Sequence, residues 1–259
     1  MAGTREAFLE WYALSANAAN TNTYEKLPQL VDIDEYLTYM AVEFYLGGTD
    51  WPQNNIKGFR PRTENGRFRF VMFDLDGTLA TTTPFSTFEQ KQTYTFDYIY
   101  DMNGHLTEEI EMVTIFLNML ENESFRKQFI DTYCLVAGSV FEPTRCNEII
   151  DEMAARTAPI LAYEGQSPMG TANSLKSSLA NRSNTMINAL IAYWRMGLTS
   201  KMKQTVSIKA NIADAPLRLN DMTIPTNQFS GTLFAPITLR AEDVPGYRFV
   251  GWSTQSSTV

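Results

Sequence analysis

Four acidic and amide side chains are spaced so that they could bind a metal ion together. Asp50 is followed five residues later by Asn55, and Asp74 and Asp76 come further along the chain. Two carboxylates about 5 Å apart repel each other by roughly 3 kcal/mol at an effective dielectric constant near ~20, so converging carboxylates need a cation or must bind protons. Hard oxygen ligands without His or Cys suit Mg²⁺. If these residues converge in the fold, we therefore expect a magnesium ion among them.

The order of these residues is that of a protein-kinase active site. In kinases, a loop aspartate accepts the proton of the substrate hydroxyl and a later asparagine holds one magnesium ion. An aspartate after a hairpin then holds the metal ions that bridge the phosphates. Asp and Asn are also common turn residues, and Asp76 followed by Gly77 is a typical turn dipeptide. Each position taken alone is therefore also compatible with a loop or cap role.

A helix and a hairpin are predicted to place these residues. Residues 31–48 show apolar side chains at helical spacing, with Asp32 as the N-cap and Glu35 three residues on, as in a capping box. A pair of glycines ends the helix. Residues 56–60 and 67–73 flank a polar turn that contains Asn-Gly, which predicts a hairpin. The hairpin ends at the first aspartate of Asp-Leu-Asp.

The remaining chain shows helical periodicity first and strand alternation afterwards. Further helices are predicted over residues 107–120, 123–136, 143–158 and 174–196, and strands over residues 206–212 and 233–239. The pattern changes near Ser200, which predicts a boundary there. The predicted fold class is α+β, with a mainly helical lobe over residues 1–200 and a small all-β module over residues 201–259. We expect this module to be cut short at its polar end.

The composition excludes several other classes of protein. The chain has 259 residues, of which 44% are hydrophobic and 19% charged, as in folded globular proteins. A net charge of -8 argues against binding to nucleic acid, which requires clustered Lys and Arg. The single histidine, His105, is expected in an exposed turn, and the only cysteines are Cys134 and Cys146, so multi-His and four-Cys zinc sites are excluded. No apolar run is long enough to span a membrane.

Residues 31–76 resemble the spore coat protein H (CotH) kinase family, an atypical bacterial branch of the protein-kinase fold. The motifs that carry the resemblance are Gly-Thr-Asp-Trp-Pro-Gln-Asn-Asn-Ile-Lys and Phe-Asp-Leu-Asp. Residues 116–137 and 149–159 look like the helical lobe of the same family. The resemblance extends over residues 31–197 and implies the large lobe of an atypical kinase-like fold, with a catalytic-loop β-hairpin.

This resemblance also implies a catalytic site with cofactors. It assigns Asp50 as the catalytic base and Asn55 as a metal ligand. Asp74 becomes the principal magnesium ligand and Asp76 a second carboxylate. Members of the family are thought to transfer phosphate from ATP to Ser or Thr hydroxyls of proteins, so the implied cofactors are ATP and Mg²⁺ and the implied partner is a protein substrate. The resemblance further implies a bacterial location in the cell envelope or spore coat.

The nucleotide-binding part of a kinase is not evident in this sequence. A kinase grips its nucleotide with a small lobe that carries a glycine-rich loop and a Lys–Glu pair. Only thirty residues precede Val31, and Lys26 is the single lysine among them. We therefore expect residues 1–200 to lack the small lobe.

A second interpretation concerns the same aspartates. Residues 69–82 place Asp-Leu-Asp-Gly-Thr-Leu after an apolar strand, which looks like the first motif of haloacid-dehalogenase-type phosphatases. In that chemistry Asp74 would be the covalent nucleophile and Asp76 the acid/base, with magnesium neutralising the phosphate. That family requires a parallel α/β sheet, which the predicted elements do not supply. The kinase interpretation is therefore favoured.

A third interpretation is a non-catalytic coat or surface module. Residues 205–252 end in Gly-Tyr-Arg-Phe-Val-Gly-Trp, which resembles the closing strand of small β-rich repeat modules on bacterial surface proteins. Such a module would serve adhesion or spacing. The sequence leaves this alternative open beside the two enzymatic ones.

Overall fold

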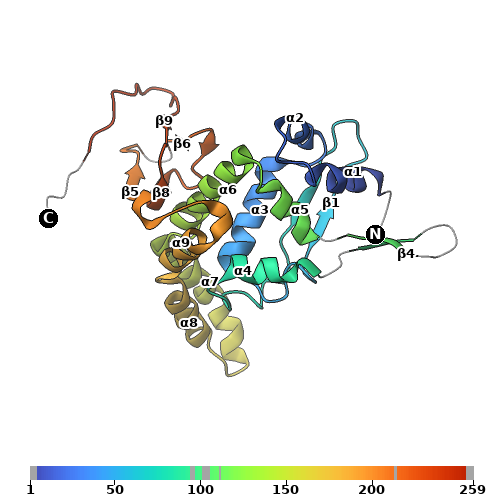
Figure 1. Cartoon of the computed structure of the whole chain (residues 1–259). Helices are drawn as coiled ribbons and strands as arrows, with labels where there is room; N and C mark the ends of the chain where they lie inside the picture. The colour runs from blue at the N-terminus through green and yellow to red at the C-terminus, as the bar shows by residue number, and fades with distance from the viewer. Residues whose placement is uncertain (1–4, 94–96, 101–105, 111, 213–214, 255–259) are drawn as a thin grey trace.

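Helices come first along the chain and small antiparallel sheets come last, with two short hairpins between helices (Figure 1). The computed structural model describes residues 5–93, 97–100, 106–110, 112–212 and 215–254. This mainly helical α+β architecture confirms the predicted fold class at that level. His105, expected in an exposed turn, lies outside the described residues.

The α-helices are α1 (Glu6–Ser15), α2 (Thr21–Tyr24), α3 (Ile33–Leu46), α4 (Pro84–Glu89), α5 (Met112–Met119), α6 (Glu123–Leu135), α7 (Pro143–Tyr163), α8 (Met169–Leu179) and α9 (Arg182–Ala192). The strands are β1 (Lys57–Phe59), β2 (Arg69–Val71), β3 (Asp97–Tyr100), β4 (Leu106–Ile110), β5 (Lys203–Lys209), β6 (Leu217–Leu219), β7 (Met222–Thr223), β8 (Gln228–Phe234) and β9 (Leu239–Ala241). Other helical turns are η1 (Leu27–Gln29), η2 (Gln90–Thr93), η3 (Val136–Val140), η4 (Trp194–Met196) and η5 (Ser200–Met202).

Helix α3 runs through the centre of the molecule and is buried on most sides (Figure 1). Near its C-terminal end, Phe44 lies among aromatic rings from α4, α5 and α6. Their ring centroids lie 4.6 Å from that of Phe44 for Phe85, 4.9 Å for Phe88, 5.3 Å for Phe116 and 5.8 Å for Phe129. Such aromatic pairs stabilise a core beyond the area that they bury. Packing from three other helices therefore fixes the end of α3 that leads into the predicted site.

The first turn of α3 differs from the predicted capping box. Asp32 occupies the N-cap position, but its side chain makes no capping bond. Its carboxylate instead accepts hydrogen bonds from the Arg69 guanidinium at 2.8 and 3.1 Å. Glu35 accepts one from the backbone N–H of Phe70 at 2.9 Å. The capping box is wrong because β2 lies against this end of the helix and offers the carboxylates a cation and a free N–H.

The predicted hairpin is confirmed. Strands β1 and β2 pair antiparallel, with Lys57 opposite Val71. On the inner face of β2, the Phe70 ring stacks on Tyr39 of α3 at a centroid distance of 5.0 Å. This contact packs the hairpin against α3. The chain that leaves β2 then returns toward the C-terminal end of the same helix.

The helix predicted over residues 107–120 is wrong in its first part. Strand β4 occupies most of that part and pairs antiparallel with β3, and helix α5 begins only at Met112. A short stretch with apolar residues at both ends is compatible with either a helix or a strand. Whether such a stretch forms a helix or a strand depends on whether a partner strand lies beside it, which the tertiary structure determines.

Two other helix predictions are confirmed and one is divided. The helices predicted over residues 123–136 and 143–158 exist as α6 and α7, although α7 continues to Tyr163. The helix predicted over residues 174–196 is divided into α8, α9 and η4. The first residue of α9 is Arg182, whose side chain bonds to backbone carbonyls at the end of α3. This contact joins the start of α9 to the end of α3.

The C-terminal strands form two small antiparallel sheets, β5–β8 and β7–β6–β9. The strand predicted over residues 206–212 overlaps β5, which ends at Lys209. The strand predicted over residues 233–239 is wrong over most of its length, because β8 ends at Phe234 and Pro236 has no N–H to donate to a neighbouring strand.

The two C-terminal sheets pack on α6 and η3. A Cβ at Gly138 of η3 would lie 2.4 Å from the ring of Phe229, so only glycine permits this close approach. Asn220 donates a hydrogen bond to buried Asp131 of α6 at 2.7 Å. Sheets and helices share one hydrophobic core, and the boundary near Ser200 stays a prediction.

The stretch that resembles a closing strand, residues 246–252, forms no strand in the structure. The last strand is β9, and no further strand follows it in the described chain up to residue 254. The rings of Phe249 and Trp252 pair with each other at 5.4 Å and stay exposed. A strand needs a neighbouring strand to satisfy its backbone, and none lies beside these described residues.

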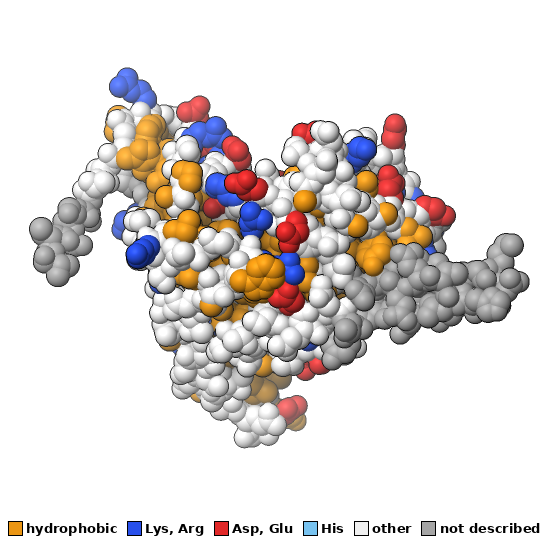
Figure 2. Space-filling view, viewed as in Figure 1, with side chains coloured by type: hydrophobic (Ala, Val, Ile, Leu, Met, Phe, Trp, Pro, Cys, Tyr) orange, Lys and Arg blue, Asp and Glu red, His pale blue; other side chains and the backbone are white. Residues whose placement is uncertain are grey.

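Charged side chains of both signs are interspersed on the face shown in Figure 2, and no patch of a single sign dominates it. Within the ranges that the structure describes, no helix combines the length and the apolar character needed to cross a membrane. The longest helix, α7, carries charged side chains such as Asp151, Glu152 and Arg156.

Candidate functional site

The loop that follows α3 carries two of the predicted site residues. Gly47 ends the helix in the left-handed conformation, with a φ of 61°, which glycine adopts without strain. The loop then folds back on itself, because the carbonyl of Asp50 accepts hydrogen bonds from the N–H groups of Asn54 at 3.0 Å and Asn55 at 3.3 Å. This turn keeps Asp50 and Asn55 close together.

The segment after β2 lies alongside this loop. The N–H of Thr49 donates a hydrogen bond to the carbonyl of Gly77 at 3.2 Å. The side-chain amide of Asn55 donates to the carbonyl of Asp74 at 3.3 Å. Asp74 itself has a φ of 57°, in a region that Asp tolerates better than most residues. Backbone bonds and one side-chain bond therefore join the two loops that carry the predicted site.

Three of the four residues singled out from the sequence line one small depression: Asp50, Asn55 and Asp74. Its other lining residues are Glu43, Gly48, Trp51, Phe73, Leu75, Gly77 and Thr78. The carboxylates of Asp50 and Asp74 are exposed and form no ion pair or hydrogen bond with any described residue. Asp76 is exposed too but does not line the depression. The structure thus gathers three of these residues and leaves Asp76 to one side.

The carboxylate and amide oxygens of Asp50, Asn55 and Asp74 are ligand atoms of the kind that Mg²⁺ prefers. The N–H of the Asn55 amide is used on the Asp74 carbonyl, so Oδ1 is the amide atom left for a cation. Mg²⁺ commonly takes one or two protein carboxylates and completes its octahedron with water and phosphate oxygens. Across the described ranges, no group of three or more His, Cys, Asp or Glu side chains is arranged to hold a metal ion. Asp50, Asn55 and Asp74 suit partial rather than complete coordination.

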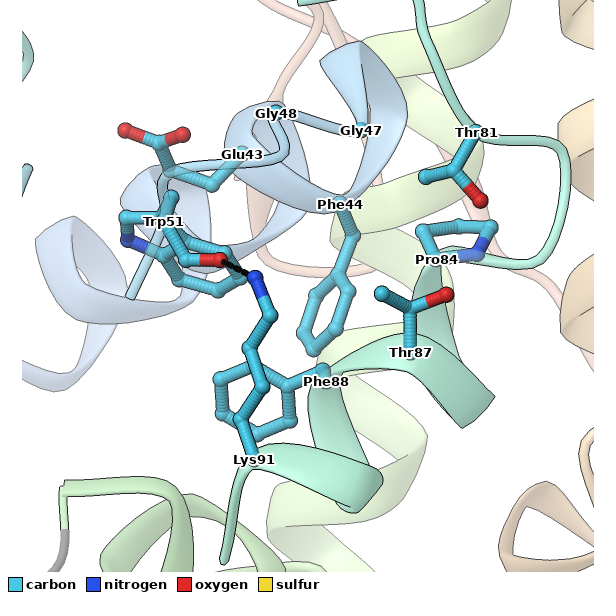
Figure 3. Close-up of a pocket in the computed structure, with 10 residues that line it drawn as sticks. All are labelled: Glu43, Phe44, Gly47, Gly48, Trp51, Thr81, Pro84, Thr87, Phe88 and Lys91. Carbon is cyan, nitrogen blue, oxygen red and sulfur yellow. Dashed lines mark hydrogen bonds between the residues drawn. The ribbon is translucent and has the colours of Figure 1, made fainter. Parts of the chain in front are cut away.

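A buried lysine that the sequence analysis did not single out lies behind the Asp50 loop. The Lys91 ammonium donates hydrogen bonds to the carbonyl of Thr49 at 2.8 Å and to that of Trp51 at 2.5 Å, the second of which is drawn in Figure 3. Burial lowers the pKa of Lys91, and the nearby charge of Asp50 acts in the opposite direction. Lys91 is separated from the loop by 40 to 42 positions, so no local spacing points to it.

Glu43 is a second group that the sequence analysis missed. It lies one turn before the end of α3, is only 2% exposed, and lines both the Asp50 depression and the neighbouring one beside Lys91 (Figure 3). Burial raises the pKa of its carboxyl to about 7, while a hydrogen bond with Tyr39 acts in the opposite direction. Its Oε1 has no hydrogen-bond partner among the described residues. The sequence signal that could have indicated a buried carboxyl is the single Glu in the otherwise uncharged stretch Met-Ala-Val-Glu-Phe-Tyr-Leu.

Arg182 closes the end of α3 from another side. Its Nε donates to the carbonyl of Tyr45 at 2.8 Å, and its Nη2 donates to those of Leu46 at 2.8 Å and Thr81 at 3.3 Å. Carbonyls at a helix C-terminus lack partners within the helix and lie at the negative end of its dipole. A Cβ at Gly47 would lie 2.9 Å from this guanidinium, so the glycine makes room for it. Arg182 therefore links α9, α3 and the loop that carries Thr81.

Comparison with known families agrees with these motifs. The model of the family described as CotH kinase protein matches residues 4–193. This range includes the complete stretch from Asp50 to Asp76 as well as Lys91 and Arg182. No curated protein and no solved structure matches the chain. Because the family model covers most of its length, the chain belongs to the CotH kinase family.

Proposed function

We propose that this protein is an atypical protein kinase that transfers the terminal phosphoryl group of ATP to Ser or Thr hydroxyls of a protein, with Mg²⁺ as a cofactor. The observation that supports this most directly is the common depression lined by Asp50, Asn55 and Asp74. Membership of the CotH kinase family supports the kinase-like class. In this proposal the helices around α3 form the large lobe of the kinase.

Asp50 is the proposed catalytic base. Its exposed carboxylate has no partner within the described chain, so it is free to accept the proton of an incoming hydroxyl. Asn55 and Asp74 are the proposed metal ligands, with Asp74 as the principal one. The metal, when bound, neutralises charge on the phosphates. For Asp76, the role of second carboxylate rests on the sequence resemblance, since this residue lies outside the depression.

The proposed location is the cell envelope or spore coat of a bacterium. It rests on the family, whose name refers to the spore coat. The acceptor would then be a protein of that layer with accessible Ser or Thr side chains.

The sheets of this protein do not support the phosphatase interpretation. The strand before Asp74 is β2, the second strand of an antiparallel hairpin. Every sheet among the described residues is antiparallel, and the one parallel pairing is an isolated bridge between Val31 and Phe68. A nucleophilic aspartate at the end of a parallel strand therefore has no counterpart here. The non-catalytic interpretation is decided by the experiment below.

The experiment measures transfer of labelled γ-phosphate from ATP to Ser- and Thr-containing acceptor proteins, with and without Mg²⁺. We expect Asp50→Asn and Asp74→Asn each to lower the rate by about 100-fold or more, because each removes a group that acts on the reacting atoms. Asp243→Asn is the control, since Asp243 is exposed and outside the depression. We expect it to transfer phosphate at the wild-type rate.

Three outcomes would contradict the proposal. Equal transfer by the wild type and both site variants would remove Asp50 and Asp74 from the reaction. An acyl-phosphate trapped on Asp74 would restore the phosphatase interpretation. A wild-type protein that neither binds ATP nor transfers phosphate would support the non-catalytic module.

A further inference from the structure

Lys91 has an unusual environment for a lysine. It lies in η2, directly after α4, is 9% exposed, and forms no ion pair with any described residue. Within the described part of the chain, its ammonium bonds only to backbone carbonyls. Removing an ammonium from water costs several kcal/mol unless hydrogen bonds replace its hydration. Because burying the Lys91 ammonium has this cost, we infer that the ammonium does something here that an apolar side chain could not do.

The two carbonyls that Lys91 holds belong to Thr49 and Trp51, the residues immediately before and after Asp50. The backbone on both sides of Asp50 is therefore held from behind, while its carboxylate is exposed in front. The Asp50 carbonyl is held as well, by the N–H groups of Asn54 and Asn55. With these groups fixed, the direction of the Cα–Cβ bond of Asp50 is set, and with it the region that the carboxylate reaches.

We propose that Lys91 is the positioning residue of the Asp50 loop: its ammonium holds the two carbonyls that flank Asp50 and so aims the Asp50 carboxylate into the depression. This inference rests on the proposed role of Asp50 as the catalytic base. It does not require Lys91 to touch a substrate. The charge of Asp50 acts to raise the pKa of Lys91, against the effect of burial, and so favours the ammonium form that donates to the two carbonyls.

The test compares three variants. Lys91→Met keeps the length of the side chain without the ammonium, and Lys91→Arg keeps the charge and the donors. Lys176→Met is the matched control, because the Lys176 ammonium bonds to Asp151 where α8 packs on α7, away from the depression.

For turnover, we expect Lys91→Met to lower kcat by about 10- to 100-fold and to change the KM for ATP by less than about threefold, because a misplaced base slows the chemical step without changing nucleotide binding. Lys91→Arg is expected to retain kcat within about tenfold of the wild type, since it can still bond to the carbonyls. The control is expected to match the wild type.

Hydrogen exchange gives a readout that does not depend on activity. The N–H groups of Thr49, Asn54 and Asn55 are hydrogen-bonded within the site. We expect exchange over residues 47–56 to become about tenfold faster in Lys91→Met, because the loop opens locally more often. Exchange in α6 and the midpoint of global unfolding should match the wild type. A lysine that serves only global stability would shift the midpoint instead.

A wild-type kcat in Lys91→Met, or unchanged exchange over residues 47–56, overturns the inference. If the wild-type protein transfers no phosphate, the proposed function fails, whereas the exchange experiment still decides whether Lys91 holds the loop. If Lys91→Met does not fold, Lys91→Gln takes its place. That variant keeps one donor group without the charge, and it is expected to change kcat and exchange in the same directions.

Discussion

The carboxylates at the two ends of α3 differ in what they contact. At the N-terminal end, both carboxylates accept hydrogen bonds from strand β2: Asp32 from the Arg69 guanidinium and Glu35 from the backbone N–H of Phe70. Beyond the C-terminal end, Asp50 and Asp74 are exposed and have no partner among the described residues. One pair of acidic residues serves the fold, and the other is left available to a ligand.

The cations near the site explain how its carboxylates stay free. Lys91 and Arg182 are both buried, and both bond to backbone carbonyls rather than to Asp50 or Asp74. The loops are therefore held by groups that do not compete for the carboxylates. At one end of α3 the acidic side chains hold the chain, and beyond the other end they are available to a ligand. Four substitutions test this difference.

The largest effect is expected at Arg182. Arg182→Met removes the donor of the Tyr45 and Thr81 carbonyls, while the Leu46 carbonyl keeps its hydrogen bond from the N–H of Leu79 at 2.6 Å. Buried acceptors that lose their partners are costly. We expect the free energy of unfolding to fall by about 3 kcal/mol in chemical denaturation.

The control for this substitution is Arg156→Met, which removes a largely exposed guanidinium whose one ion-pair partner among the described residues is Glu152. We expect it to change the free energy of unfolding by less than about 0.5 kcal/mol. A loss below about 1 kcal/mol in Arg182→Met would show that water satisfies the carbonyls and that the arginine does not hold this end of α3.

An intermediate effect, dependent on pH, is expected at Glu43. Its pKa is raised from 4.5 to about 7, so the folded protein holds this proton more tightly than the unfolded chain does. Stability is therefore lost as the pH rises from about 4.5 through 7. We expect Glu43→Gln, which stays neutral, to be more stable than the wild type by about 2 kcal/mol at pH 8 and equal to it near pH ~4.

Urea denaturation at a series of pH values without added metal measures this difference. Glu64→Gln is the control, because Glu64 is exposed in the β1–β2 turn. A difference between Glu43→Gln and the wild type that does not vary with pH would show that the pKa of Glu43 is the same in the folded protein as in the unfolded chain.

The smallest effects compare the two kinds of carboxylate directly. Asp32→Asn removes an ion pair whose Arg69 partner is 57% exposed, so we expect a loss of only about 0.5–1 kcal/mol. Asp50→Asn removes no contact of the carboxylate with any residue that the structure describes, and we expect its free energy of unfolding to stay within about 0.5 kcal/mol of the wild type. Thermal unfolding of both variants under one condition makes the comparison. Equal losses of stability in the two variants would show that the carboxylates at the two ends of α3 contribute equally to the fold.

The elements nearest the site were the most predictable ones. Helix α3 is marked by apolar residues at helical spacing and by Gly47, which ends it and has a positive φ in the structure. The β1–β2 hairpin is marked by its Asn-Gly turn. The order of Asp50, Asn55 and Asp74 also pointed to one site. Local signals suffice here because each of these features is specified within a few residues.

Other elements depended on partners that are distant in sequence. Strand β4 formed where a helix was predicted, because β3 provides a partner. Residues 246–252 resemble a strand but have no neighbouring strand among the described residues, and they form none. The capping box at Asp32 gave way to contacts with β2. In each case a local preference of modest size yielded to a contact made by the fold.

The sequence by itself determined which chemistry is available: the carboxylates, the amide between them and the family to which the chain belongs. Only the tertiary structure decided that Asp50, Asn55 and Asp74 share a depression that Asp76 does not line. It also decided that Lys91 and Arg182 keep the loops in place, although they lie 40 to 42 and 101 to 137 positions away from the carbonyls that they hold. The physical reason is that every residue has the same backbone carbonyl, so no sequence pattern marks the one that a cation will bind.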